Sequence, residues 1–105
     1  MSFIVVYITH ATEKVATKVS NYLIEQKFVA CANIFPIKSG YWWKDVIQSE
    51  NEWVSIVKTT TENWIPLKNE VEKIHPYEVP CIMKIEVEAN ESYEKWIRES
   101  VDSKS

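Results

Sequence analysis

The chain contains very little glycine and cysteine. One glycine and four prolines occur in 105 residues, which predicts few and short loops, because glycine is the usual residue of tight turns. Two cysteines, Cys31 and Cys81, are too few and too far apart to indicate a disulfide framework. The N-terminal segment MSFIVVYITH lacks the basic flank and the small-residue cleavage site of a secretory signal. We therefore expect a cytoplasmic protein with free thiols.

Long apolar runs and blocks of like charge are also missing. No apolar stretch approaches the roughly 20 residues that a membrane-spanning helix needs. The net charge is −3 and no cluster of lysine and arginine occurs, so we expect neither a membrane nor a nucleic acid as a partner. Hydrophobic residues make up 46% of the chain, which is typical of a globular protein. The length fits a single domain spanning residues 1–105.

Aromatic residues, in contrast, are abundant. Five Trp, five Tyr and three Phe occur, and three of them are consecutive at Tyr41, Trp42 and Trp43. Each buried aromatic side chain removes on the order of 150–250 Å² from water, and a small domain has limited room for them. Two interpretations stay open: an aromatic-rich core, or aromatic residues that lie between chains or line a pocket.

The order of the sequence patterns predicts four strands and three helices. Continuous or alternating apolar residues favour strands, and apolar residues at spacings of three and four favour helices. Strands are expected over 3–8, 28–43, 50–59 and 81–88, and helices over 11–27, 64–74 and 91–101. This β-α-β-β-α-β-α order predicts the α+β class: a ferredoxin-like antiparallel sheet with an added C-terminal helix. Two helices on one sheet face would leave the other face for the last helix or neighbouring subunits to cover.

Particular residues predict the boundaries of these elements. Lys44 and Asp45 form the expected hairpin turn, because aspartate tolerates the left-handed region. Asn63 and Asn90 are expected to cap the second and third helices. Pro36 predicts an edge strand or a bend.

The segment HPYEVP, residues 75–80, admits two interpretations. Its two prolines end the second helix and lead into the last strand, so it can be a stiff connector. It also carries His75, Tyr77 and Glu78, which are side chains that binding sites and catalysis often use. Since loops on rigid scaffolds frequently carry function, the residues alone leave both interpretations open.

Three segments with specific spacing carry a resemblance: CANIFPIKSGYWWKD, EWVSIVKTT and IHPYEVP. In these segments the chain resembles the CutA divalent-cation tolerance family, over roughly Phe3 to Trp96. The resemblance implies a fold like that of PII signalling proteins and a homotrimer whose long β-hairpins wrap neighbouring subunits. It implies a link to tolerance of copper and other divalent cations, with no assigned enzymatic activity. It also implies that Trp42 and Trp43 lie at the subunit interface.

The same resemblance bears on metal binding. The resemblance implies that the ligands of copper-binding relatives are one cysteine in the first strand and two adjacent histidines before Pro-Tyr. The corresponding residues here are Ile8, Ile74 and His75. Because isoleucine cannot bind a metal, His75 is the remaining metal contact, and we expect copper or another divalent cation to bind weakly. Cys31 is a further, weaker candidate, because its sulfur is a soft ligand.

A mixed-charge set forms the expected ligand cleft. The resemblance implies that Lys58, Tyr77 and Glu78 gather between subunits, together with Tyr41 and Trp42. These residues either bind a ligand or only fix the trimer through ion pairs. The expected function is therefore weak metal or small-ligand binding without catalysis. The alternative is a PII-like sensor or assembly protein whose cleft binds an anionic metabolite.

Overall fold

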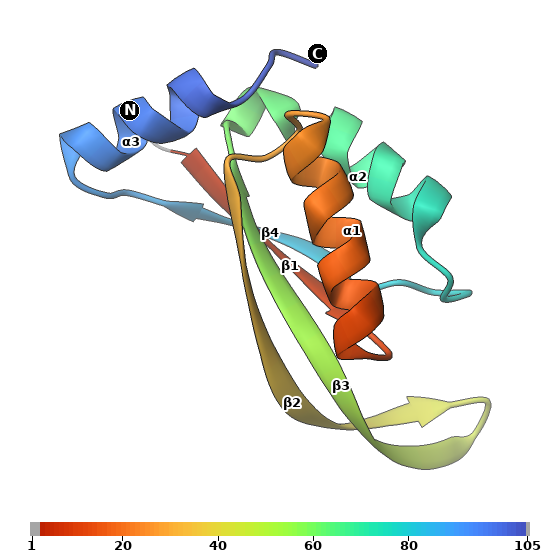
Figure 1. Ribbon diagram of the computed structural model, residues 1–105. Coiled ribbons are helices and arrows are strands. Elements are labelled where there is room, and N and C mark those ends of the chain that lie inside the picture. The colour runs from red at the N-terminus through yellow and green to blue at the C-terminus, as the bar shows by residue number, and fades with distance from the viewer. Residues whose placement is uncertain (1–2, 105) are drawn as a thin grey trace.

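A computed structural model describes residues 3–104 of the chain. Four antiparallel strands form one sheet in the order β2-β3-β1-β4, as Figure 1 shows. The strands are β1 (Phe3–His10), β2 (Cys31–Trp43), β3 (Val46–Thr59) and β4 (Ile82–Val87). The helices are α1 (Glu13–Glu25), α2 (Trp64–Ile74) and α3 (Glu91–Ser100), and a short 3₁₀ turn, Thr61–Asn63, precedes α2. The predicted ferredoxin-like α+β fold with an added C-terminal helix is confirmed.

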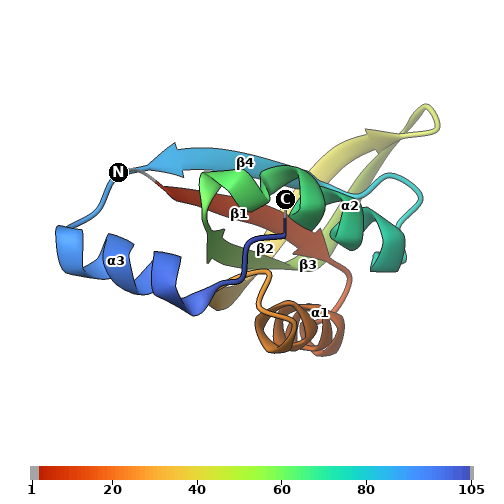
Figure 2. The same cartoon turned by 90° about the horizontal axis from the view of Figure 1, so that it is seen from above.

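The core lies between α1, α2 and one face of the sheet. Ile4, Val6 and Ile8 alternate along β1 and are fully buried on this face. Both helices cover the same face because β-α-β crossovers are right-handed, and Figures 1 and 2 show the two helices next to the sheet. The other members of this core cluster come from α1, the segment after it, β3 and α2: Val19, Leu23, Val29, Val57, Leu67 and Val71.

The opposite face of the sheet is apolar and only partly covered. Val5 of β1 pairs with Ile85 of β4, and Tyr7 pairs with Met83. Met83 and Ile85 are 50% and 51% exposed, although their alternation with charged residues predicts a half-buried strand. The predicted burial is not seen in the single chain, where Met83 and Ile85 are exposed like their charged neighbours Lys84 and Glu86. α3 reaches only one end of this face, where the rings of Phe3 and Tyr93 lie 6.0 Å apart.

Strands β2 and β3 extend well beyond the rest of the sheet. The pairing of β1 with β3 stops at Trp53, so residues 37–43 and 46–52 pair only with each other. We call these two segments the hairpin arm. The predicted turn at its tip is confirmed: Lys44 and Asp45 both have positive φ, at 49° and 64°, as two-residue hairpin turns prefer. The arm contributes to an elongated chain of 45 × 25 × 22 Å.

The helix boundaries follow from local chemistry. α1 begins after Thr12, whose hydroxyl accepts a hydrogen bond from the Val15 N–H at 3.1 Å. It ends before Lys27, which has a φ of 57°, so the helix is shorter at both ends than predicted. α2 ends at Ile74, as Pro76 requires. None of the helices within residues 3–104 has the length and apolar character needed to cross a membrane.

The predicted helix caps are right in position but differ in bonding. Asn63 and Asn90 precede α2 and α3, yet neither side chain accepts a backbone N–H of its helix; the Asn90 amide instead donates to the Ser92 hydroxyl at 2.9 Å. The Asn63 amide instead donates to the Asp102 carbonyl at 2.8 Å and accepts from the Lys104 N–H at 3.0 Å. Asn63 therefore ties the C-terminal segment to the start of α2.

Candidate functional site

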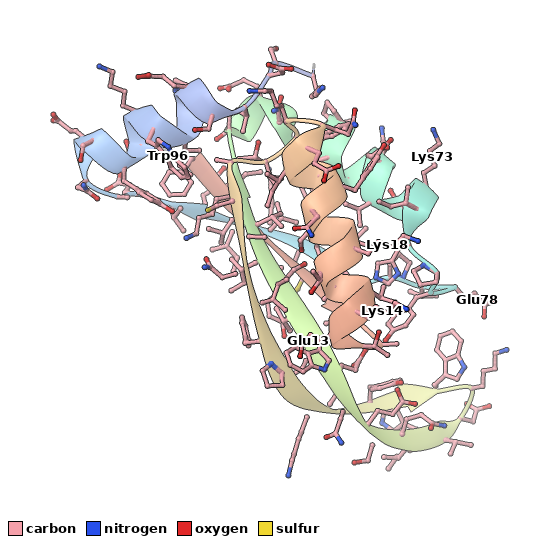
Figure 3. The ribbon with its side chains drawn as sticks, in the orientation of Figure 1. Glu13, Lys14, Lys18, Lys73, Glu78 and Trp96 are labelled. Atoms are coloured by element: carbon pink, nitrogen blue, oxygen red, sulfur yellow. The ribbon has the colours of Figure 1, made fainter. Side chains whose placement is uncertain are left out.

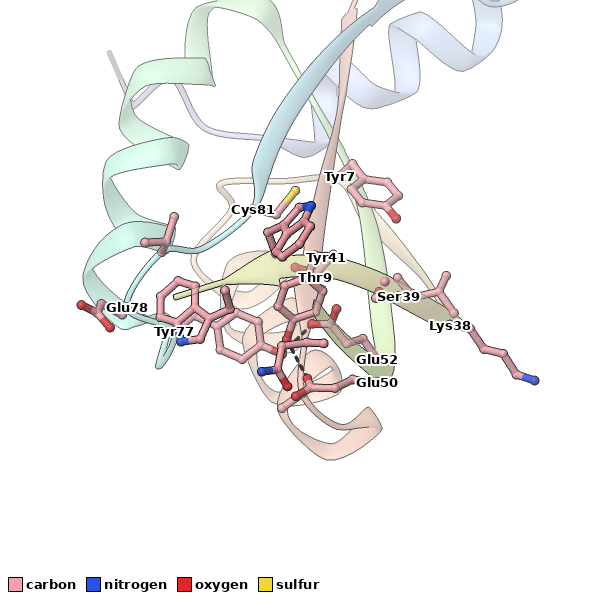
Figure 4. A pocket seen from close by; sticks show the side chains of 17 residues that line it. Tyr7, Thr9, Lys38, Ser39, Tyr41, Glu50, Glu52, Tyr77, Glu78 and Cys81 are labelled. Carbon is pink, nitrogen blue, oxygen red and sulfur yellow. Dashed lines mark hydrogen bonds between the residues drawn. The ribbon is translucent and has the colours of Figure 1, made fainter. Parts of the chain in front are cut away.

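The hairpin arm, the loop between α2 and β4 and one end of β1 line an open cavity of about 920 Å³. Figure 4 shows this cavity from close by, and Figure 3 shows Glu78 projecting outward from the loop. A volume of this size lies within the range of small-molecule sites. Five aromatic residues contribute to the lining: Tyr7, Tyr41, Trp42, Trp43 and Tyr77.

Two tyrosine–carboxylate pairs lie side by side in the cavity. The Tyr77 hydroxyl donates to Glu52 Oε2 at 2.7 Å, and the Tyr41 hydroxyl donates to Glu50 Oε2 at 2.9 Å. Glu52 is only 6% exposed. Burial, together with the hydrogen bond to Glu52, raises the pKa of Tyr77 well above its usual range. The hydrogen bond to Glu50 raises the pKa of Tyr41. Both phenols therefore remain hydrogen-bond donors at neutral pH.

Two histidines lie behind these tyrosine–carboxylate pairs. The rings of His10 and His75 stack with their centroids 5.4 Å apart. His10 is fully buried, with Nε2 2.8 Å from the Ser55 hydroxyl. Burial, reinforced by the neighbouring His75, lowers the pKa of His10 to about 4, although Glu52 acts in the opposite direction. The His10 imidazole is therefore neutral at physiological pH.

Both ring nitrogens of His75 are used within the protein. Nε2 lies 2.7 Å from the Thr9 carbonyl oxygen; since a carbonyl cannot donate, Nε2 carries the proton. Nδ1 accepts the Tyr77 N–H at 3.1 Å. This pair of bonds fixes the ring and places Tyr77 against Glu52. A metal ion could take either nitrogen only by breaking one of these hydrogen bonds.

Within residues 3–104, the positions expected to bind a metal do not gather into a ligand set. Ile8, which the resemblance places at a ligand position of copper-binding relatives, is fully buried in the core, and Ile74 packs against that core. Within residues 3–104, no group of three or more His, Cys, Asp or Glu side chains is arranged to hold a metal ion. His75 as a weak metal contact stays a prediction.

Lys58 and Cys31 lie away from the cavity in the single chain. They pair across β3 and β2, and both contact the hydroxyl of Tyr93 on α3, at 3.1 Å from Lys58 Nζ and 3.6 Å from Cys31 Sγ. The hydrogen bond to Tyr93 raises the pKa of Lys58. Lys58 is six residues from Glu52 on the same strand, or about 20 Å.

The structure therefore divides the predicted cleft residues into two groups. Tyr41, Trp42, Tyr77 and Glu78 line one cavity, whereas Lys58 does not. A Lys58 side chain from another subunit at this cavity stays a prediction.

Sequence reasoning missed Glu50, Glu52 and Cys81, which also line the cavity. A signal for the two glutamates was present. Because the turn is at Lys44 and Asp45, a two-residue hairpin places Glu50 opposite Ser39, on the same face as Tyr41. No comparable local signal predicts Cys81, whose thiol pKa is raised by burial.

Comparisons with known proteins assign the chain to a family. A family model described as "CutA1 divalent ion tolerance protein" matches residues 4–100. The chain belongs to the CutA family. It is 44% identical over 99 residues to the divalent-cation tolerance protein CutA of Thermotoga maritima, covering 93% of this chain and 98% of the relative. The resemblance inferred from the three sequence segments is thereby confirmed.

Solved CutA structures share the fold closely. The "Periplasmic divalent cation tolerance protein CutA from Archaeoglobus fulgidus" has a TM-score of 0.90 and 38% identity, covering 97% of this chain and 100% of that chain. The "PII-like protein CutA from Nostoc sp. PCC 7120" has a TM-score of 0.90 and 26% identity, covering 95% and 98%. The CutA relation to the PII-like fold is confirmed. Since one relative is described as periplasmic, the cytoplasmic location of this chain stays a prediction.

Proposed function

We propose that this CutA protein is a cytoplasmic homotrimer, each subunit a single domain, that acts in divalent-cation tolerance by binding a metal ion or small ligand weakly, without catalysis. The observation that carries the proposal is the amount of apolar surface left uncovered on one chain. Trp42 is 71% exposed, and Met83 and Ile85 are about half exposed. Large exposed apolar side chains of this kind are typical of interaction surfaces, and the family resemblance indicates that other subunits cover them.

We expect the purified protein to be an obligate trimer. Obligate interfaces resemble a domain core cut in two, so the isolated subunit should be unstable. Light scattering after size exclusion measures the mass directly. A well-folded monomer at micromolar concentration would contradict the trimer.

The absence of catalysis is supported by the state of the reactive groups near the cavity. The Tyr41 and Tyr77 hydroxyls donate to carboxylates, and both nitrogens of His75 are bonded. Burial raises the pKa of the Cys81 thiol, which keeps it from forming the nucleophilic thiolate. Among the described residues, those that line the cavity provide binding groups but no activated nucleophile next to a free base, and the neighbouring His10–Ser55 pair is fully buried.

The charge of the cavity favours a cation over the anionic metabolite of the alternative function. Three glutamates line the cavity, Glu50, Glu52 and Glu78, against one lysine, Lys38. Figure 4 shows Lys38 extending away from Glu50 and Glu52. An anion here would meet carboxylates that are already close together.

Copper titration of the wild type and His75→Ala tests the metal part of the proposal. At pH 7.5 we expect weak binding by the wild type and a further loss in His75→Ala. Copper should bind more tightly than zinc or nickel, following the usual divalent order. Binding should weaken at pH 5.5, because protons compete with the metal for its ligands.

The same titration can reject each part separately. Equal copper binding by His75→Ala at pH 7.5 would show that His75 is not a ligand. Sub-nanomolar binding by the wild type would reject the weakness of the site. Because His75 also fixes the loop, circular dichroism of His75→Ala is needed as a control for folding.

A further inference from the structure

We propose that the cavity beneath the hairpin arm binds a small organic ammonium ion, held between aromatic rings and the carboxylates of Glu50 and Glu52. This inference rests on the proposed function in that it uses the same cavity, but it requires no metal ion. It names the chemical class of the ligand from the charge and shape of the lining.

The first observation is a buried carboxylate without a positively charged partner. Glu52 is 6% exposed and lines the cavity. It accepts a hydrogen bond from the Tyr77 hydroxyl, and within residues 3–104 no lysine or arginine forms an ion pair with Glu50 or Glu52. Burying a carboxylate without an opposite charge is costly. A cation in the cavity would offset that cost.

The second observation is the aromatic lining. The rings of Tyr7, Tyr41, Trp43 and Tyr77 line the same cavity as the two carboxylates. Aromatic faces attract ammonium groups through their quadrupole, more strongly when the site is desolvated. Carboxylates alone would suit many cations. The combination with aromatic rings favours an ion that also carries apolar groups.

The two glutamates are oriented to act together. Figure 4 shows both carboxylates directed toward the tyrosine hydroxyls, with the hydrogen bonds as dashed lines. Each tyrosine uses Oε2 of its glutamate, so each carboxylate keeps acceptor capacity for a ligand. The volume of about 920 Å³ leaves room for a substituent beyond the ammonium head.

The assembly is expected to close this site. Trp42 lines the cavity, and we place the neighbouring subunit next to it. Exclusion of water by that subunit would strengthen both the ionic and the cation–π interactions. The test therefore uses the native assembly.

Isothermal titration of the native protein with choline tests the inference, with 3,3-dimethyl-1-butanol as the uncharged analogue of the same shape. Choline should bind at least about tenfold more tightly than the neutral analogue, because only choline offers a cation to the rings and carboxylates. Equal affinities, or no choline binding by the folded assembly, would overturn the proposal.

Variants that replace one glutamate by glutamine test which carboxylates bind choline. Glu52→Gln and Glu50→Gln should each weaken choline binding about tenfold, while an exposed control, Glu25→Gln, should leave it unchanged. Because Glu50 is exposed, Glu50→Gln should fold normally. It therefore keeps the test valid if Glu52→Gln folds poorly. Unchanged affinity in Glu50→Gln and in folded Glu52→Gln would reject this site.

The outcome is separable from that of the proposed function. Choline binding without copper binding would support the organic cation and reject the metal. Copper binding without choline binding would reject only the inference made here. Light scattering on the same samples reports the trimer independently of both ligands.

Discussion

Replacing Trp42 by alanine is expected to dissociate the assembly while leaving the subunit fold intact. The side chain is 71% exposed in the single chain, so the subunit core loses little. If a neighbouring subunit buries it, as we propose, truncation of a packed aromatic costs about 3–5 kcal/mol. Trp43→Ala, in the same arm, should also weaken assembly. Sedimentation velocity across a concentration series measures the effect.

Substitutions of Trp64 and of two isoleucines test whether the effect on assembly is specific to the arm. Trp64 packs partly against the core, so Trp64→Ala should lower the stability of the subunit more than it lowers assembly. Ile47 in the arm and Ile65 on α2 are 66% and 53% exposed, which makes them a matched pair. Ile47→Ala should weaken the trimer, and Ile65→Ala should not. If Trp64→Ala alone dissociates the trimer, the arm is not at the interface.

Lowering the pH should destabilise the folded protein through His10. The pKa of His10 is lowered from 6.5 to about 4 in the folded state, so between these values the unfolded chain binds more protons. The stability due to neutral His10 is fully present above pH 6.5 and is lost as the pH falls toward 4. The shift corresponds to about 3 kcal/mol. Urea unfolding at fixed protein concentration between pH 7 and pH 4 measures it.

His10→Gln isolates this contribution from the titration of the carboxylates. Glutamine does not titrate and can keep a polar contact with Ser55, which lies 2.8 Å from His10 Nε2. The groups that set the His10 pKa, besides burial, are His75 and Glu52, and both remain in the variant. The difference in stability between wild type and His10→Gln should therefore change by about 3 kcal/mol across this range. A difference that does not vary with pH would contradict the neutral, buried state of His10.

The sequence by itself determined the elements and their order. The apolar run of β1 predicts a buried strand, and Pro76 sets the end of α2, because these effects depend on neighbours along the chain. The turn at Lys44 and Asp45 also fixes which residues of the hairpin pair, through the geometry of a two-residue turn. Together with the three segments that identify the family, these local rules were sufficient for the fold.

Only the tertiary structure decided which side chains meet. Strand β3 carries both Glu52 and Lys58, but its length separates them, so one lines the cavity and the other bonds to Tyr93. The stacking of His75 on His10, and the use of both His75 nitrogens, depend on contacts between β1 and the loop after α2. Periodicity assigns a residue to a face of its own element, but not to a partner on another. Burial, hydrogen bonding and the charge of the cavity arise only when the strands and loops pack together.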